Sequence, residues 1–294
     1  MLSFTLDANL PLEPFPHYWE NCVGSCHAYT ALRQDYRVQL ARAHRELGFR
    51  YVRFHGLLDD EMSVVTKSRD GKITYNFNNI DGIFDFLLGI GMKPFIELGF
   101  MPSALASGNV TCFHYHGNVT NPKDYGAWDQ LITTLTAHLA ARYGTDEVAQ
   151  WYFEVWNEPN LRYFYAGTQE EYFELYRHTA LAVKKVDGRF RVGGPATSNN
   201  AWLPEMVAFC RKSDTPLDFL STHHYPTDDP LWNSGMSLET FIRQAKLKDG
   251  AKPKDGPDYH RGILTKMAKQ AQQEAGRYPL YYTEWNTSAR EADG

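Results

Sequence analysis

The feature that most constrains the fold is a regular alternation of short apolar runs with helical patterns along nearly the whole chain. The runs predicted as strands are Asn21–Ser25, Tyr51–His55, Lys93–Leu98, Trp151–Trp156, Phe190–Gly194, Asp218–His223 and Leu280–Glu284. Several of them are apolar on both faces, as strands buried in a parallel sheet are. This alternation predicts a parallel sheet covered by helices.

The segments between these runs carry helix start and stop signals. The predicted helices are Leu32–Leu47, Ile80–Ile90, Pro122–Tyr143, Gln169–Val186, Trp202–Lys212 and Arg261–Ala275. Asn121 and Thr168 are the expected N-caps of the third and fourth. Glycine, a natural C-cap, directly follows several of these helices, at Gly48, Gly91, Gly144 and Gly276.

The length of the chain suits one large domain or two small ones, and it does not by itself demand a domain boundary. An α/β barrel takes about 250 residues, and this chain has 294. The predicted strands number seven, and the last ends ten residues before Gly294. We therefore expect an α/β fold, a (β/α)8 TIM barrel truncated after strand seven, with residues 1–294 forming one catalytic barrel domain that is incomplete at its C-terminus. An open doubly wound sheet is the alternative, but no Gly-x-Gly-x-x-Gly opens the first helix for dinucleotide binding.

Two long polar and aromatic segments follow predicted strands. They are Gly99–Pro122 and Tyr225–His260. Both come after strand C-termini, which is where a barrel builds its active site.

Charge and hydropathy argue against several classes of protein. The formal net charge is −5 and the basic residues are scattered, which argues against nucleic acid and a polybasic membrane contact. No apolar run approaches the roughly 18 residues of a membrane span. Met1–Pro11 shows no secretory signal, so we expect a cytoplasmic protein. The cysteine spacing matches no zinc or redox motif, and free, mostly buried thiols are expected at Cys22, Cys26, Cys112 and Cys210.

Two glutamates at predicted strand ends are the strongest candidates for chemistry. Glu158 precedes Pro159, which is expected to hold the chain extended at the strand exit. Glu284 lies 126 residues later, or three β/α units of 42 residues, a spacing compatible with strands four and seven. Carboxyl groups about 5–5.5 Å apart there are typical of a retaining glycosidase. The non-catalytic alternatives are that Glu158 is a solvated glutamate at the start of a helix and that Glu284 is a buried glutamate paired with an arginine. Glu154, deeper in its strand, is instead expected to pair with a cation such as Arg53.

Five motifs make the chain resemble glycoside hydrolase family 39, the β-xylosidase and α-L-iduronidase family. They are Trp19–Ser25, Arg53–Gly56, Asp81–Pro102, Phe153–Pro159 and Thr283–Ser288. The resemblance covers nearly the whole chain and is strongest to the bacterial β-xylosidases. It implies a barrel with catalytic glutamates on strands four and seven. The eighth strand and the C-terminal β-sandwich that the family adds are expected to be absent, which would leave unpaired edges on strands one and seven.

The resemblance also implies roles for individual residues. It makes Glu158 the acid/base and Glu284 the nucleophile, and it places Asn157 at the sugar 2-hydroxyl. It assigns sugar or nucleophile contacts to His55, His223, His224 and Tyr225. From the chemistry, Tyr225 is expected to donate to Glu284, and Trp156 and Trp285 to wall the sugar subsite. Strand neighbours His223 and His224 point to opposite faces and lack further ligands, so no metal or cofactor is expected.

The predicted function is retaining hydrolysis of β-1,4-xylosidic bonds in xylo-oligosaccharides by double displacement. The preference for xylose rests on the resemblance alone. The expected partner is an oligosaccharide, with no nucleic acid or membrane, and self-association into a homo-oligomer stays open. The alternatives are an endo-acting or exopolysaccharide hydrolase with the same machinery, a non-catalytic carbohydrate-binding fragment and, more weakly, a metal-dependent barrel hydrolase.

Overall fold

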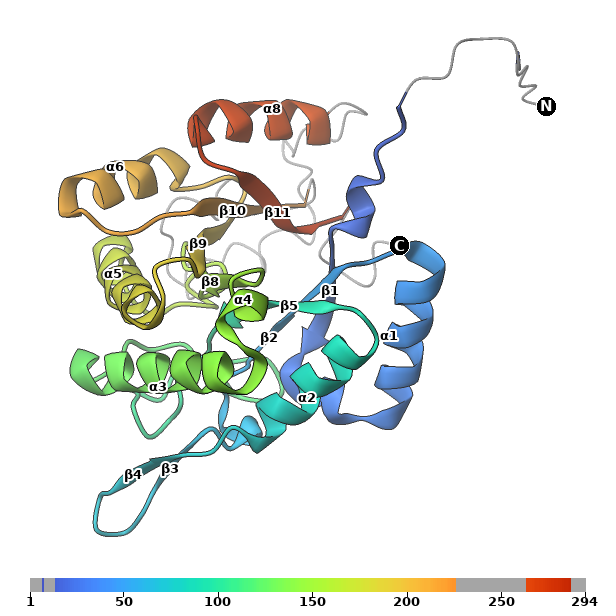
Figure 1. The fold of residues 1–294 in the computed structure, drawn as a ribbon. Coiled ribbons are helices and arrows are strands. Elements are labelled where there is room, and N and C mark those ends of the chain that lie inside the picture. The colour runs from blue at the N-terminus through green and yellow to red at the C-terminus, as the bar shows by residue number, and fades with distance from the viewer. Residues whose placement is uncertain (1–6, 8–13, 226–262, 287–294) are drawn as a thin grey trace, which may run out of the picture.

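In the computed structural model of the protein, residues 7, 14–225 and 263–286 are described (Figure 1). A seven-stranded sheet forms the centre, and its strands follow one another in chain order. They are β1 (Cys22–His27), β2 (Tyr51–His55), β5 (Lys93–Leu98), β8 (Tyr152–Val155), β9 (Arg191–Ser198), β10 (Phe219–His224) and β11 (Leu280–Trp285). All neighbouring strands are parallel. The expected α/β barrel sheet is confirmed.

Helices surround this sheet, as Figure 1 shows. They are α1 (Gln34–Leu47), α2 (Asn78–Gly89), α3 (Tyr125–Tyr143), the single turn α4 (Thr145–Val148), α5 (Gln169–Val186), α6 (Leu203–Ser213) and α8 (Ile263–Ala275). Short 3-10 turns lie at Tyr18–Glu20, Ala28–Leu32 and Asp60–Met62. Trp128 of α3 is fully buried and donates from its indole nitrogen to Thr179 of α5 over 2.8 Å. Burying a large apolar side chain of this kind contributes roughly 1.5–3 kcal/mol.

Most predicted boundaries agree with the structure to within two residues, but the end of β9, at Ser198 instead of Gly194, and the start of α3 are wrong. The expected cap at Asn121 is engaged elsewhere, because its side chain accepts a hydrogen bond from the Tyr165 hydroxyl. The backbone of Pro122 forms an isolated antiparallel bridge with the preceding insertion. The helix begins at Tyr125, where the Asp124 side chain accepts from the backbone N–H two residues on. Arg261, the expected first residue of the last helix, lies outside the described residues.

Two small hairpins extend from the barrel. One, β3 (Val65–Lys67) with β4 (Ile73–Tyr75), lies between β2 and α2, projects away from the sheet in Figure 1 and was not predicted. The other, β6 (Thr111–Cys112) with β7 (Gly117–Asn118), folds the first long insertion over the strand ends. The second insertion lies outside the described residues beyond Tyr225.

An aromatic plug fills the barrel interior at the N-terminal ends of the strands. We use this name for Phe95, Tyr152 and Phe219 with the partly buried Tyr51 and Tyr281 packed against them. Ring contacts cross the interior between strands that are not neighbours, as between Phe95 and Phe219 at 5.6 Å and between Tyr152 and Tyr281 at 5.1 Å. The hydroxyls of Tyr152 and Tyr281 are hydrogen-bonded over 2.9 Å. The plug closes this end of the barrel.

The two end strands of the sheet, β1 and β11, approach each other without pairing in the part of the chain that the structure describes. A Cβ placed on Gly24 would lie 4.0 Å from the backbone oxygen of Thr283. The sheet is therefore curved almost into a closed barrel. The expected unpaired edges are present among the described residues.

The cysteines are free thiols, as predicted, but only half of them are buried. Cys112 and Cys210 are buried, Cys22 is partly exposed and Cys26 is exposed. Burial raises the pKa of the Cys22 thiol to about 12 despite the nearby Arg53. None of the described helices is both long and apolar enough to cross a bilayer.

Candidate active site

Glu158 and Glu284 meet at the C-terminal ends of the strands, although they are far apart in the sequence. Glu158 follows β8 and is 6% exposed, and Glu284 lies near the end of β11. His223, from β10, lies between them. Its Nδ1 is 3.0 Å from Glu158 Oε1 and 3.7 Å from Glu284 Oε2. One oxygen of each carboxyl lies within 4.8 Å of the other. Both side chains therefore face one shared space.

A strained strand exit directs the Glu158 side chain inward. Trp156 and Glu158 have φ values of 72° and 42°, in the left-handed region. Such positions cost on the order of 1–3 kcal/mol each unless the surroundings fix them. The Glu158 N–H donates to Ala196 O over 2.9 Å, and its carbonyl accepts from Leu161 N–H over 2.9 Å. The expectation that Pro159 holds Glu158 extended is wrong, because the residue escapes the right-handed helical region through positive φ instead.

Arg53 of β2 connects most of the acidic groups of the site. It is only 2% exposed, and it donates from Nε to Glu154 Oε2 over 2.5 Å and from Nη1 to Glu284 Oε1 over 2.7 Å. Its Nη2 lies 2.9 Å from both Asn157 Oδ1 and Glu97 Oε2. The predicted pairing of Glu154 with Arg53 is confirmed. Pairing of Glu284 with an arginine, the alternative stated for that residue, is present as well. The contact with Glu97 was missed.

The surroundings of Glu284 favour its ionised form. Burial alone would raise its pKa, but the positive charges of Arg53 and His55 outweigh burial. The Tyr225 hydroxyl adds a hydrogen bond to Glu284 Oε2 over 2.9 Å, so the pKa of Glu284 is held well below its usual range. Burial lowers the pKa of His223 to about 4, so this ring is neutral near pH 7. Arg53 is then the permanent cation that keeps Glu284 ionised.

The surroundings of Glu158 have the opposite effect. Burial, followed by the negative charge of Glu284, raises its pKa well above the usual range. Two carboxyls whose pKa values are pushed apart in this way form an acid and an anion at the same pH. This is the division of roles that a sugar-cleaving pair needs.

His55 and Asn157 lie where the sequence places them, beside the pair. His55 Nδ1 is 2.7 Å from Glu97 Oε2, and its Nε2 is 3.5 Å from Glu284 Oε1. Burial lowers the pKa of His55, but the charges of Glu97 and Glu284 outweigh it and raise the pKa overall. Asn157 is 1% exposed and is oriented by Arg53.

Trp156, Trp285 and His224 differ from the other predicted site residues in how they lie relative to the carboxyl pair. Trp285 is 62% exposed at the end of β11, and its role as a wall of the sugar subsite stays a prediction. Trp156 does not offer the expected ring face, because it is fully buried and donates to the Phe164 carbonyl over 2.8 Å. His224 points to the other face of β10, where its Nδ1 lies 3.1 Å from Asn199 Oδ1. In the described part of the chain, His224 therefore contributes no contact to the carboxyl pair.

The first insertion brings aromatic rings to the site, as its position after a strand predicted. Phe113 stacks on His55 at 5.6 Å with an interplanar angle of 26°. Tyr115 stacks on His27 of β1 at 4.1 Å and 10°. The Tyr163 hydroxyl accepts from the Phe113 backbone N–H over 2.9 Å, which ties the insertion to the segment after β8. These rings form an apolar rim next to the polar pair.

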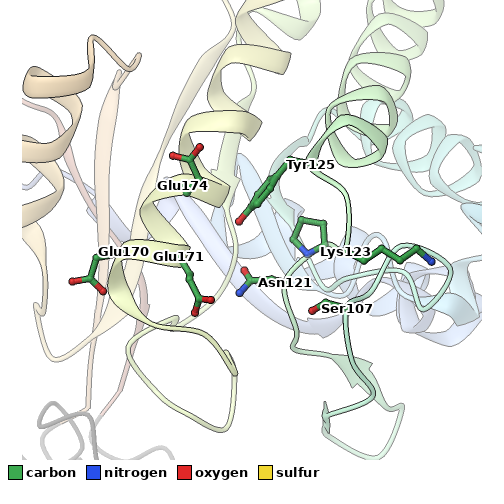
Figure 2. A pocket seen from close by; sticks show the side chains of 8 residues that line it. Ser107, Asn121, Lys123, Tyr125, Glu170, Glu171 and Glu174 are labelled. Carbon is green, nitrogen blue, oxygen red and sulfur yellow. The ribbon is translucent and has the colours of Figure 1, made fainter.

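A separate cavity of about 610 Å³ lies between the starts of α3 and α5 (Figure 2). Its lining residues are Ser107, Asn121, Pro122, Lys123, Tyr125, Glu170, Glu171 and Glu174. Glu171 belongs to the capping box of α5, and Glu174 pairs with Arg177 over 2.5 Å. Figure 2 shows the Lys123 amine pointing away from these carboxylates. Glu171 and Glu174 are therefore engaged within α5, and the Lys123 amine donates to the Ala104 carbonyl over 2.8 Å.

The fold and the site together define a class of protein. A parallel β/α barrel with a proton-holding glutamate and an ionised glutamate facing each other at the strand C-termini has the architecture of a barrel glycoside hydrolase. Comparison with known proteins narrows this class. The model of glycosyl hydrolases family 39 matches residues 2–293, and the chain belongs to that family.

The chain is similar to several known proteins of this family. It is 51% identical to a β-xylosidase of Caldicellulosiruptor saccharolyticus over 100% of the chain and 57% of that protein. It is 40% identical to a β-xylosidase of Geobacillus stearothermophilus over 94% of the chain and 54% of that protein. The crystal structure of a monomeric β-xylosidase from Caulobacter crescentus superimposes with a TM-score of 0.80 at 40% identity, covering 94% of this chain and 54% of the other. The chain thus spans about half the length of these relatives.

Proposed function

We propose that residues 1–294 form the catalytic barrel domain of a retaining β-xylosidase. The observation that carries the proposal is the carboxyl pair, with one oxygen of each group within 4.8 Å of the other and with opposite pKa shifts. Retaining glycosidases place these carboxyls about 5–5.5 Å apart, whereas inverting enzymes need room for an intervening water. The similarity to two β-xylosidases supports xylose as the sugar.

In the first step, Glu284 attacks the anomeric carbon of the non-reducing xylose while Glu158 donates its proton to the glycosidic oxygen. The C–O bond to the leaving sugar breaks, and an ester bond to Glu284 forms. Arg53 and Tyr225 hold Glu284 as an anion oriented for attack, since both donate to its oxygens. Asn157, fixed by Arg53, is the group that hydrogen-bonds the sugar 2-hydroxyl.

In the second step, a water molecule replaces the departed sugar. Glu284 is now an uncharged ester, so the charge that raised the pKa of Glu158 is gone. Glu158 takes a proton from the water as the oxygen attacks the same carbon, and the ester bond breaks. The product is xylose with the β configuration of the substrate.

The substrate of this proposal is a short β-1,4-xylo-oligosaccharide. The apolar rim of Phe113 and Tyr115 suits the C–H face of the second sugar, because aromatic rings present flat apolar surfaces. Xylo-oligosaccharides are uncharged, so the substrate needs no Lys or Arg side chain to neutralise it.

The test is the stereochemistry of hydrolysis by the 294-residue chain. Proton NMR during cleavage of p-nitrophenyl β-D-xyloside is expected to show β-xylose first and α-xylose only later, by mutarotation. Immediate appearance of α-xylose would contradict the retaining mechanism. A panel of aryl glycosides, with α-L-iduronide and α-L-rhamnoside among them, tests the sugar. Binding of xylo-oligosaccharides without release of nitrophenol would indicate a non-catalytic binding domain.

A further inference from the structure

A buried chain of hydrogen bonds connects Glu154 with Glu158 through Thr283 and His223. Thr283 Oγ1 donates to Glu154 Oε1 over 2.9 Å, and His223 Nε2 lies 3.1 Å from the same Oγ1. On its other side, His223 Nδ1 lies 3.0 Å from Glu158 Oε1. All four residues are buried, with at most 7% of each exposed.

The direction of this chain is set at the Glu154 end. Glu154 pairs with Arg53 over 2.5 Å, and an ionised carboxylate only accepts hydrogen bonds. The single hydroxyl proton of Thr283 must therefore point to Glu154. The lone pair of Thr283 Oγ1 is left to accept, and the donor is the Nε2–H of His223.

The neutral state of His223 then fixes its second nitrogen. Burial lowers the pKa of His223 to about 4, so near pH 7 the ring carries one proton. With that proton on Nε2, Nδ1 is an acceptor. The 3.0 Å contact with Glu158 is a hydrogen bond only if Glu158 supplies the proton.

The reversed direction fails on the same contacts. If Thr283 donated to His223, two acceptor oxygens would face each other between Thr283 and Glu154 at 2.9 Å. A buried pair of this kind leaves a hydrogen bond unmade, which destabilises the fold. The order with Thr283 donating to Glu154 avoids that loss at every link.

We propose that Thr283, backed by Glu154, is a positioning residue that fixes the tautomer of His223 and thereby keeps the proton of the catalytic pair on Glu158. The inference rests on the proposed function and deepens it. We call the hydrogen-bonded series of Glu154, Thr283 and His223 the relay. No proton passes along the relay during turnover. Glu158 alone gives its proton to the leaving group, and the Nδ1 lone pair then disfavours the Glu158 anion and favours its return to the acid form.

The other charged groups around Glu158 agree with this assignment. From the elements packed against it, the described groups are Arg53 and His55 of β2, Glu97 of β5, Glu154 of β8 and Glu284 of β11, with the Tyr225 hydroxyl. Arg53 and His55 balance two of the three carboxylates Glu97, Glu154 and Glu284. A further anion at Glu158 would have no cation left to balance it among these groups.

The direct test is the tautomer of His223 in the 294-residue chain labelled with ¹⁵N-histidine. Long-range ¹⁵N–¹H correlation at pH 7 is expected to show a protonated Nε2 and an unprotonated Nδ1, with the His223 signals identified by their loss in His223→Asn. In Thr283→Val, which removes the hydroxyl but keeps the shape, the proton is expected to move to Nδ1. Thr283→Ser, which keeps the hydroxyl, is expected to match the wild type.

Kinetics supply a second readout. Without the relay, His223 Nδ1–H donates to Glu158 and stabilises its anion. The basic limb of the kcat/KM profile of Thr283→Val is therefore expected to move to lower pH by about one unit, the size of one hydrogen bond. The loss should grow as the aryl leaving group becomes poorer. Thr222→Val removes a neighbouring buried hydroxyl that donates to Thr197 O over 2.8 Å, outside the relay, and should leave the limb in place.

The outcomes separate this inference from the proposed function. A wild-type His223 protonated on Nδ1 overturns the relay, whatever the activity. An unshifted basic limb in a folded Thr283→Val also overturns it. The predicted tautomer in a chain that cleaves no glycoside supports the relay and rejects the hydrolase alone.

Discussion

At the scale of single residues, the contacts of Arg53 explain why this position holds an arginine and not a lysine. Its planar fork reaches Glu154 through Nε, Glu284 through Nη1 and Asn157 through Nη2. A lysine ammonium is a compact point charge on a flexible stem and does not serve such separated acceptors in fixed directions. One guanidinium therefore sets both the charge and the orientation of Glu284.

Removal of the carboxyls tests their roles one at a time. Glu284→Ala is expected to lower turnover by about 10⁴–10⁶-fold, because the covalent step is lost. Azide should partly restore cleavage of an activated xyloside and give the α-xylosyl azide. Glu158→Ala should spare glycosylation by substrates with good leaving groups, and azide should give the β-product. Product NMR identifies the two azides, and the same anomer from both variants would contradict the assignment.

Truncation of Arg53 tests its electrostatic role. Arg53→Met is expected to lower the unfolding free energy by about 3–5 kcal/mol, because it leaves buried carboxylates without their cation. Urea denaturation measures the change. Arg45→Met is the matched control, since Arg45 is 70% exposed beside Glu46 and exposed ion pairs contribute little. Equal effects of the two substitutions would reject the role given to Arg53.

At the scale of elements, helix α5 shows how local signals position the site. Its Thr168 hydroxyl accepts from Glu171 N–H over 3.3 Å, and the Glu171 carboxylate accepts from Thr168 N–H over 2.7 Å. On the same helix, the Tyr172 hydroxyl donates to the carbonyl of Val155, the last residue of β8, over 2.9 Å. The cap thus fixes a helix that supports the strand exit leading to Glu158.

Loss of this cap is expected to affect stability and not chemistry. Thr168→Ala should cost about 1 kcal/mol, because one helix N–H loses its partner. Urea denaturation should show this loss, and Thr168→Ser should recover most of it. The shape of the pH–rate profile should stay that of the wild type in both variants. A changed profile would mean that the start of α5 acts on the carboxyl pair.

At the scale of the whole molecule, the periodic pattern of the sequence predicted the sheet, its helices and the convergence of Glu158 and Glu284. Those features depend on local apolar spacing and on the meeting of parallel strand ends. The wrong start of α3 and the missed contacts of Glu97 depend on partners far away in the sequence. A single signal was available for Arg53, a cation between the apolar residues Val52 and Phe54 in a predicted strand. Trp156 was misassigned because the sequence does not show that its ring turns into the core.

Protonation of Glu158 has a consequence for the stability of the fold. Because its pKa is raised in the folded chain, the unfolded chain ionises first as pH rises above about 4.5, and the wild type loses stability through that window. Glu158→Gln does not titrate. Its unfolding free energy relative to wild type should therefore increase with pH, with a slope of at most about 1.4 kcal/mol per pH unit. Urea denaturation between pH 4 and 8 measures this difference, and a constant difference would contradict a protonated Glu158.

Metal removal tests the chemistry of the molecule as a whole. Glu158, His223 and Glu284 each offer a donor atom, all within 4.8 Å of one another, so a metal ion could bind at the carboxyl pair. Acid and nucleophile are both supplied by carboxyls in the proposed mechanism. Xyloside turnover after dialysis against EDTA should therefore equal that of the untreated chain. Loss of turnover that zinc or magnesium restores would require a metal-dependent mechanism.

The aromatic plug governs how solvent reaches the catalytic centre. Among the described residues, Phe95, Tyr152 and Phe219 fill the interior at the strand N-termini, whereas Glu158 and Glu284 lie at the strand C-termini. Substrate and water then reach the pair from the same end of the barrel. The first leaving sugar has to vacate its place before a hydrolytic water arrives, so departure and hydration follow a compulsory order.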